Sequence, residues 1–273
     1  MEQVSTSGVL NTLKEVPARP KVIVTMPAYR AERTLSKTLY DIPPDLADEI
    51  IVVDDASPDN TVQVAKTLGL NVVIHQANRG YGGNQKTCYD YALKYDADIV
   101  VLLHPDYQYT PKVLPDLIRP LLENRADFTF GSRFANSGKP LQGGMPFYRY
   151  VGNRFLTIFE NMVLGTHFTE LHSGLKAYTR RFLTELDYHS YDEAFVFDSE
   201  MLIEAVLLGY RIEEVPIPTR YAADSSSTSI KASLIYVAKT MKQVVEARLG
   251  AGEIRARHKN RMKHKYAKLS TNL

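Results

Sequence analysis

The chain has 273 residues, a hydrophobic content of 44%, a charged content of 23% and 17 tyrosines, a composition that excludes disordered and fibrous proteins. Its single cysteine, Cys88, excludes an intramolecular disulfide and a zinc site made of several thiolates, and it fits a reducing compartment. The formal net charge of +2 hides an asymmetry, because 8 Lys and Arg residues but only 1 acidic residue follow from Arg248 onward, against 25 basic and 30 acidic residues before it. The C-terminal segment therefore carries the charge that would attract a partner.

Residues 1–20 lack a positively charged start followed by an apolar run, so they do not predict a signal peptide. The longest apolar runs, 50–53 and 99–103, are far shorter than the ~18 residues of a membrane span. We therefore expect a cytoplasmic protein with no membrane-spanning segment.

Short β-branched segments alternate with amphipathic segments through the first half of the chain. We expect strands at 21–29, 48–57, 70–77, 97–106 and 126–134, and helices at 32–42, 60–69, 82–96 and 112–124. The strand segments are almost continuously apolar, which is typical of a sheet covered by helices on both faces. The alternation predicts an α/β fold with a largely parallel sheet.

The second half begins with a helix at 147–165. Arg149 and Asn153 share one of its sides, and a broad apolar face is formed by Phe147, Tyr150, Val151, Phe155, Ile158, Phe159 and Met162. A strand at 173–179, a helix at 198–210 and an extended segment at 211–221 follow. The last helix starts at 230, and its apolar stripe consists of Ile230, Leu234, Val237, Met241, Val244 and Val245. We divide the chain into an N-terminal extension (1–20), one α/β domain (21–229) and a C-terminal helix with a basic tail (230–273).

Polar residues follow four of the predicted strands: Tyr29 the first, Asp54 and Asp55 the second, Asn78 the third, and His104 with Asp106 the fourth. Ligands of open α/β sheets bind beyond the carboxyl ends of the strands. The sequence therefore predicts a single crevice at that edge of the sheet.

His104, Asp106 and Gln108 are spaced two apart, so they converge only if the chain bends, and Pro105 with the following turn could supply the bend. Such a group at a strand end could bind a divalent metal ion whose coordination a diphosphate completes. The alternative is a turn in which Asp106 caps backbone N–H groups.

Asp54 and Asp55 are adjacent carboxylates, which repel one another unless a cation or hydrogen-bond donors lie nearby. The ribose hydroxyls and base N–H of a nucleotide are such donors. Alternatively, one of the two carboxylates is a structural cap and the other faces solvent.

Gly80, Gly82 and Gly83 precede a predicted helix, where small residues let the backbone approach a ligand and the helix N-terminus favours anions. Their spacing is not that of the dinucleotide-binding G-x-G-x-x-G motif. Arg133 and Arg149 are suited to bind phosphate oxygens, although two surface arginines are the alternative.

Together, several segments resemble the family 2 glycosyltransferases of GT-A fold, and among them the branch similar to dolichyl- or polyprenyl-phosphate mannose synthases. The segments, in the family's order across 22–221, are PAYRAERTL, IIVVDDASPDNT, NRGYGGN, HPDYQYTPKVLPDL, GSRF, HSGLKAY and EVPIPTRY. The resemblance implies an inverting transferase that uses a nucleotide-sugar donor and a divalent metal ion. It also implies a Rossmann-like, mostly parallel sheet.

The resemblance also implies a donor site. Asp54 would meet the nucleotide, with Pro27, Ala28 and Tyr29 lining the base pocket and Pro105 beside it. The family's D-x-D-x-Q metal motif falls on His104, Asp106 and Gln108. The replacement of its first Asp by His104 would favour Mn²⁺ over Mg²⁺ or leave His104 without a metal ion to bind. A glutamate of the first motif falls on Ala31, with Glu32 beside it.

The implied acceptor site consists of Arg133, Arg149 and Asn153, which would bind the acceptor phosphate. Glu170 stands where relatives carry an Asp. A phosphate acceptor is already ionised near pH 7 and needs no base, whereas a hydroxyl does, and Glu170 and Asp198 are the candidates for that base.

The leading hypothesis is transfer of a sugar to a polyprenyl phosphate, with a soluble glycan or small-molecule acceptor, or a nucleotide-sugar-binding protein without turnover, as alternatives. The C-terminal stripe and basic tail could adsorb to the inner face of an anionic membrane, or the stripe could pack on the body or on a second subunit. Because Tyr266 is the one Phe, Tyr or Trp from Arg248 onward, aromatic interleaving does not support nucleic acid as a partner, and we do not expect one.

Overall fold

The computed structural model describes residues 19–135, 140–218 and 230–270. Most of the predicted N-terminal extension and the end of the extended segment at 211–221 lie outside these ranges. The strands are β1 (Val22–Ala28), β2 (Glu49–Asp54), β3 (Asn71–Ile74), β4 (Ile99–Leu102), β5 (Phe128–Ser132), β6 (Lys176–Thr179) and β7 (Ile212–Pro216). The helices are α1 (Leu35–Tyr40), α2 (Thr61–Thr67), α3 (Gly80–Lys94), α4 (Leu114–Leu122), α5 (Phe147–Leu164), α6 (Arg180–Glu185), α7 (Phe197–Leu208), α8 (Ile230–Leu249) and α9 (Ala251–Ser270).

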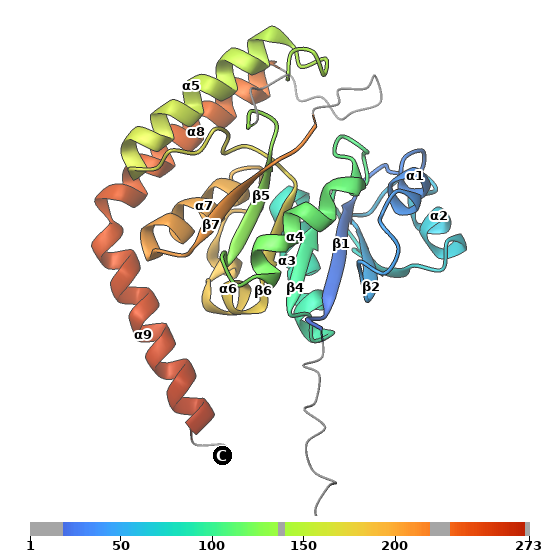
Figure 1. Cartoon of the computed structure of the whole chain (residues 1–273), viewed down its shortest axis with the longest axis horizontal. Coiled ribbons are helices and arrows are strands. Elements are labelled where there is room, and N and C mark those ends of the chain that lie inside the picture. Colours follow the sequence, from blue (N-terminus) through green and yellow to red (C-terminus); the bar gives the residue numbers. More distant parts are fainter. Residues whose placement is uncertain (1–18, 136–139, 219–229, 271–273) are drawn as a thin grey trace, which may run out of the picture.

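The strands form one seven-stranded sheet in the order β3-β2-β1-β4-β6-β5-β7 (Figure 1). β1 pairs in parallel with β2 and β4, β2 with β3, and β5 with β7, whereas β6 is antiparallel to both of its neighbours. The predicted α/β fold with a mostly parallel sheet is confirmed. Because β6 runs in the opposite direction, the residues that precede it reach the edge of the sheet at which β4 and β5 end.

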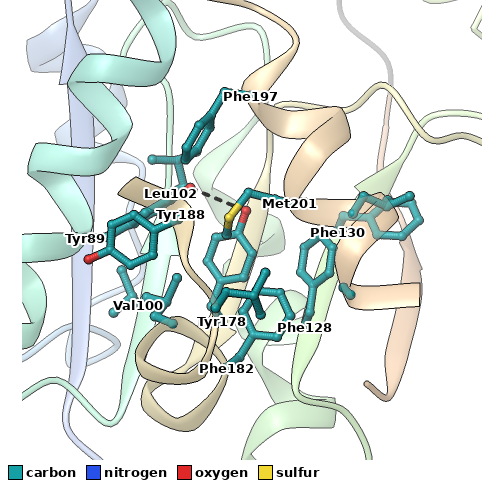
Figure 2. Close-up of a cluster of buried hydrophobic side chains, with 14 of the residues drawn as sticks. Tyr89, Val100, Leu102, Phe128, Phe130, Tyr178, Phe182, Tyr188, Phe197 and Met201 are labelled. Atoms are coloured by element: carbon teal, nitrogen blue, oxygen red, sulfur yellow. Dashed lines mark hydrogen bonds between the residues drawn. The ribbon is translucent and has the colours of Figure 1, made fainter. Parts of the chain in front are cut away.

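Helices cover both faces of this sheet, as the apolar strands predict. Successive side chains of β1 alternate between two buried clusters, with Ile23 packing on the side of α3 and Val24 on the side of α1 and α4. Figure 2 shows the aromatic part of the first cluster, in which Tyr89 of α3 lies near Phe197 of α7 and near Tyr178 of β6. This core fixes α3 and α7 relative to the carboxyl ends of the strands.

The basic tail forms a helix of its own, α9, which packs against α7. Arg255 Nε donates to the Leu207 carbonyl at 2.9 Å and Lys265 Nζ to the Thr184 carbonyl at 3.2 Å, so part of the basic charge is bound to the body. The apolar stripe predicted for α8 is divided, because Val244 is buried on the body whereas Leu234 is 65% exposed. Among the described helices, none has the length and apolarity needed to cross a membrane.

The apolar face of α5 does not lie where a face of this kind usually lies. A broad apolar face ordinarily packs on the core, but the buried residues of α5 are Leu156, Thr157, Glu160 and Leu164. Most of the predicted face, including Phe155 and Met162, is exposed to solvent.

Candidate active site

Asp54 ends β2 next to Ala28 of β1 and is almost fully buried. Its Oδ2 accepts a hydrogen bond from the Ser57 amide at 2.9 Å, whereas its Oδ1 is buried without a hydrogen-bond partner among the described residues. Buried carboxylate oxygens are almost always hydrogen-bonded. Asp54 therefore presents an unsatisfied acceptor at the edge of the sheet where donor-binding residues were predicted.

Asp55 is engaged by the protein through both oxygens. Oδ1 accepts from the Arg79 amide at 2.8 Å and lies 2.7 Å from His75 Nδ1, and Oδ2 accepts from the Gly80 amide at 3.0 Å. Asn78 also takes part, because its Nδ2 donates to the Asp55 carbonyl at 3.1 Å. The two residues hold the start of α3, which is the structural role that the sequence left open for one of the adjacent carboxylates.

The glycine-rich turn packs against protein. Gly82 and Gly83 donate their amides to the Glu193 carbonyl, and a Cβ at Gly82 would meet the Asp192 carbonyl at 2.7 Å. Gly80 has a φ of +80°, which glycine adopts without strain. The amides of Gly82 and Gly83 are thus engaged by the segment before α7, and the predicted approach of this loop to a ligand stays a prediction.

His104, Asp106 and Gln108 lie on a tight turn after β4. The bend is at Tyr107, whose φ is +56°, and Asp106 Oδ1 accepts from the Gln108 amide at 3.0 Å. One carboxylate oxygen thus has the capping role that was the alternative to metal binding, while Pro105 is buried beneath the turn.

Two residues that the sequence did not single out, Tyr81 and Lys176, surround His104. The rings of Tyr81 and His104 are stacked with centroids 5.4 Å apart, and the Tyr81 hydroxyl donates to Asp198 Oδ2 at 2.7 Å. Burial, reinforced by Asp198, raises the pKa of Tyr81 well above its ordinary value, so this proton stays in place. Since the hydroxyl has one proton, His104 Nε2, 3.3 Å from it, donates and the lone pair lies on Nδ1.

Asp198 and Lys176 form a buried ion pair in which Lys176 Nζ lies 2.7 Å from Asp198 Oδ1. Burial lowers the pKa of Lys176, and Asp198 opposes that shift. Asp198 thus faces a lysine and a tyrosine, which does not favour its role as a base. The antiparallel strand β6 brings Lys176 here, opposite Leu102 of β4. The prediction of a largely parallel sheet did not say which strand runs antiparallel.

The donor set of this turn suits a divalent cation in an open site. Burial lowers the pKa of His104, so its imidazole is neutral near pH 7 and can act as a ligand beside the Asp106 carboxylate and the Gln108 amide. Among the described residues, no three His, Cys, Asp or Glu side chains are grouped closely enough to hold a metal ion. An ion here would therefore need oxygens from a bound diphosphate or from water.

Arg133, directly after β5, and Glu170 form a buried ion pair. Arg133 Nε donates to Glu170 Oε1 at 2.8 Å, and its backbone amide donates to Oε2 at 2.7 Å. Arg133 Nη2 and Asn153 Nδ2 also donate to Oε1. These four hydrogen bonds engage Glu170 with Arg133 and Asn153, so its geometry favours orienting these two residues over acting as a base, a role that stays a prediction.

The remaining predicted residues lie at the edges of the site. Tyr29 is half-exposed after the buried Pro27 and Ala28, while Glu32 accepts from the Asn60 side chain at 3.1 Å. Arg149 lies one turn before Asn153 on α5, and its Nε donates to the Tyr148 hydroxyl at 3.2 Å.

A second buried network connects this side of the site to α8. His172 Nε2 lies 2.8 Å from Glu160 Oε2 of α5, and its Nδ1 lies 3.0 Å from the Tyr236 hydroxyl of α8. The His172 carbonyl accepts from Arg133 Nη2 at 3.2 Å. α5 and α8 are therefore attached to the loop that carries Glu170.

Known proteins share sequence similarity with most of this chain. The family model described as glycosyl transferase family 2 matches residues 23–187. A UDP-N-acetylglucosamine–dolichyl-phosphate N-acetylglucosaminyltransferase of Methanococcus voltae is 30% identical over 217 residues, which are 73% of this chain and 86% of that protein. An undecaprenyl-phosphate mannosyltransferase of Micrococcus luteus is 28% identical over 206 residues, 72% of this chain and 82% of that protein.

Among solved structures, the fold is similar to that of glucosyl-3-phosphoglycerate synthase from Mycobacterium tuberculosis in complex with Mn²⁺, UDP-glucose and phosphoglyceric acid. The TM-score is 0.65 at 20% sequence identity, over 85% of this chain and 80% of that chain. At this identity the likeness concerns the fold, and it confirms the GT-A type expected from the sequence.

Proposed function

The chain belongs to glycosyl transferase family 2, and from that premise we propose that it moves a sugar from a nucleoside-diphosphate sugar to a polyprenyl phosphate, with inversion at the anomeric carbon. The reaction would take place at the cytoplasmic face of a membrane, where such an acceptor exposes its phosphate. The acceptor class is supported by the names of two relatives, which are a dolichyl-phosphate and an undecaprenyl-phosphate transferase.

The observation that supports the donor half of this proposal is the buried Oδ1 of Asp54, which has no hydrogen-bond partner in the part of the chain that the structure describes. A nucleobase N–H or a ribose hydroxyl donates the hydrogen bond that this oxygen lacks. Tyr29 is half-exposed directly after β1, the strand that pairs with β2, and offers a ring on which a base can stack.

A divalent metal ion would be held by Asp106, with His104 and Gln108 as further ligands, and Mn²⁺ is the ion present with the structural neighbour. Bound there, it would neutralise charge on the nucleoside diphosphate as that group leaves. The chain's own residues would orient the two substrates: Asp54 the nucleotide, and Arg133 with Arg149 and Asn153 the acceptor phosphate.

An ionised phosphate acceptor agrees with the way in which the carboxylates are used. The acceptor oxygen forms a bond to the anomeric carbon as the bond to the diphosphate breaks, and no proton has to be removed first. Both candidate bases are engaged, Glu170 by Arg133 and Asn153 and Asp198 by Lys176 and Tyr81.

A soluble phosphorylated acceptor is the second candidate, and the structural neighbour favours it because its complex contains phosphoglyceric acid. The same Arg133 and Arg149 could bind either phosphate. We favour the lipid because the relatives named for lipid phosphates are closer to this chain in sequence than that neighbour.

A transfer assay separates these possibilities. UDP- and GDP-sugars would be offered with Mn²⁺ or Mg²⁺ to the full chain in the presence of a short-chain polyprenyl phosphate, 3-phosphoglycerate or neither. We expect product only with the polyprenyl phosphate and none from Asp106→Ala. Product from 3-phosphoglycerate alone would contradict the lipid acceptor, and donor binding without transfer or hydrolysis would indicate a binding protein.

A further inference from the structure

The outward side of α5 carries an apolar stripe. We use the name outer apolar face for this stripe and the exposed apolar residues of α8 described below. On α5 it consists of Phe147, Val151, Phe155, Ile158 and Met162, which recur at three- to four-residue spacing, and Met162 is 71% exposed. The residues of α5 that pack on the body lie on the opposite side of the helix. Solvent-facing stripes of globular helices are normally polar.

The helix packed alongside α5 also exposes apolar side chains. α8 lies next to α5 beyond the carboxyl end of the sheet (Figure 1) and contacts it. Leu234, Val245 and Leu249 of α8 are exposed, Leu249 by 83%. Large contiguous apolar patches on a protein surface mark binding sites for proteins or membranes.

The charges on these helices favour a membrane over a second copy of the chain. The exposed side chains of α8 include Lys239, Lys242 and Arg248, against Glu246, and α5 contributes Arg149 and Arg154 at its sides. α9, which follows α8 directly, adds further basic residues. Two copies meeting through this face would bring like charges together, whereas acidic headgroups would be complementary to them.

We propose that α5 and α8 dock the protein on an anionic lipid bilayer, with the outer apolar face entering the boundary between headgroups and acyl chains. This inference rests on the proposed lipid-phosphate acceptor. Asn153, predicted to bind the acceptor phosphate, lies on the inner side of α5, about one helix diameter, ~10 Å, from the face that would meet the lipid. Docking through α5 and α8 would thus bring the predicted acceptor site to the level at which a lipid exposes its phosphate.

Vesicle co-sedimentation of the full chain tests the dock without any substrate. We expect binding to vesicles of phosphatidylcholine mixed with phosphatidylglycerol, much weaker binding to phosphatidylcholine alone, and loss of binding as the salt concentration rises. The double variant Phe155→Ser and Met162→Ser should bind the anionic vesicles roughly tenfold more weakly or worse, because two apolar side chains no longer leave water. Tyr40→Ser on α1, where the tyrosine is 76% exposed, is the matched control and should bind like the parent chain.

Equal binding by the double variant and the parent chain, with both folded by circular dichroism, would overturn the proposal. So would a dimer in sedimentation equilibrium that the double variant dissociates, since the face would then join two copies. The vesicles contain no polyprenyl phosphate, so vesicle binding without lipid-dependent transfer would contradict the proposed function and leave the dock in place. Transfer to a detergent-dispersed polyprenyl phosphate without vesicle binding would contradict membrane docking and leave the proposed function in place.

Discussion

On the donor side of the predicted crevice, Tyr29 follows β1, Asp54 ends β2 and His104 lies two residues after β4. On the acceptor side, Arg133, Asn153 and Glu170 come from a strand end, a helix and a loop. The donor-side residues are positioned by the backbone of the sheet. The acceptor-side residues are positioned largely by one another, through hydrogen bonds that converge on the Glu170 carboxylate. Substitutions on the donor side should therefore alter ligand binding more than stability, and substitutions on the acceptor side should alter both.

The largest expected effect is that of Arg133→Met on stability. It leaves the fully buried Glu170 carboxylate without its ion-pair partner, and such a loss costs about 3–5 kcal/mol in the free energy of unfolding. Arg149→Met is the matched control, since Arg149 is more exposed and donates to a neighbouring tyrosine, and its cost should stay below about 0.5 kcal/mol. Urea unfolding measures both, and equal values would show that the acceptor side does not depend on this pair.

The next effect concerns the nucleotide. In Asp54→Asn, the asparagine oxygen would keep the hydrogen bond from the Ser57 amide, so the NH₂ group would take the place of Oδ1. The NH₂ group would then face the N–H or O–H donor of the nucleotide and could not accept its hydrogen bond. Loss of a hydrogen bond to a charged group weakens binding by roughly 10- to 100-fold. Titration of the nucleoside diphosphate into the variant measures this.

Asp55→Asn provides the contrast within the donor side. It removes the charge that holds His75 and the start of α3, so the free energy of unfolding should fall by about 1–2 kcal/mol. Its nucleotide affinity should change less than that of Asp54→Asn. If Asp55→Asn had the larger effect on nucleotide binding, this would contradict the assignment of the nucleotide to Asp54 and of the structural role to Asp55.

The last effect lies away from these residues, at the opposite edge of the sheet, and it should leave transfer unchanged. Hydrogen bonds from Arg211 hold the pKa of Asp127 below its ordinary value of 3.8, although burial opposes this. Because the folded-state pKa is depressed, the contribution of Asp127 to stability is present above about pH 4 and is lost as the pH falls through the folded-state pKa. Asp127→Asn should therefore unfold more easily than the parent chain at pH 7 by about 1–2 kcal/mol. This difference should shrink toward zero in strong acid, and sugar transfer at pH 7 should be unchanged.

The sequence predicted the donor side better than the acceptor side for a physical reason. Apolar strands covered on both faces place the residue after each strand at the same edge, so the positions of Asp54 and Asp106 followed from local patterns. The sequence also left open the structural role that the structure gives to Asp55. It did not indicate Lys176, because strand direction depends on pairings between distant segments, and β6 runs against its neighbours.

Contacts between distant segments also limit what the sequence indicates about other residues of the site. Glu170 was named as a candidate base because it stands where relatives carry an Asp, and the sequence does not show that its four hydrogen-bond donors come from residues far along the chain. The amides of Gly82 and Gly83 could not be assigned without knowing that the Glu193 segment packs on them. The apolar face of α5 was evident in the sequence, but periodicity reveals a stripe and not which side of the helix meets the body.

The division of the crevice into two sides is tested most directly by titrating UDP and GDP, each with Mn²⁺ or Mg²⁺, into the parent chain, Asp54→Asn and Arg149→Met. One of the two nucleotides should bind the parent chain and Arg149→Met with the same affinity, and Asp54→Asn roughly 10- to 100-fold more weakly. Unchanged binding by Asp54→Asn, or an equal loss in Arg149→Met, would contradict the assignment of the nucleotide to the carboxyl end of β2.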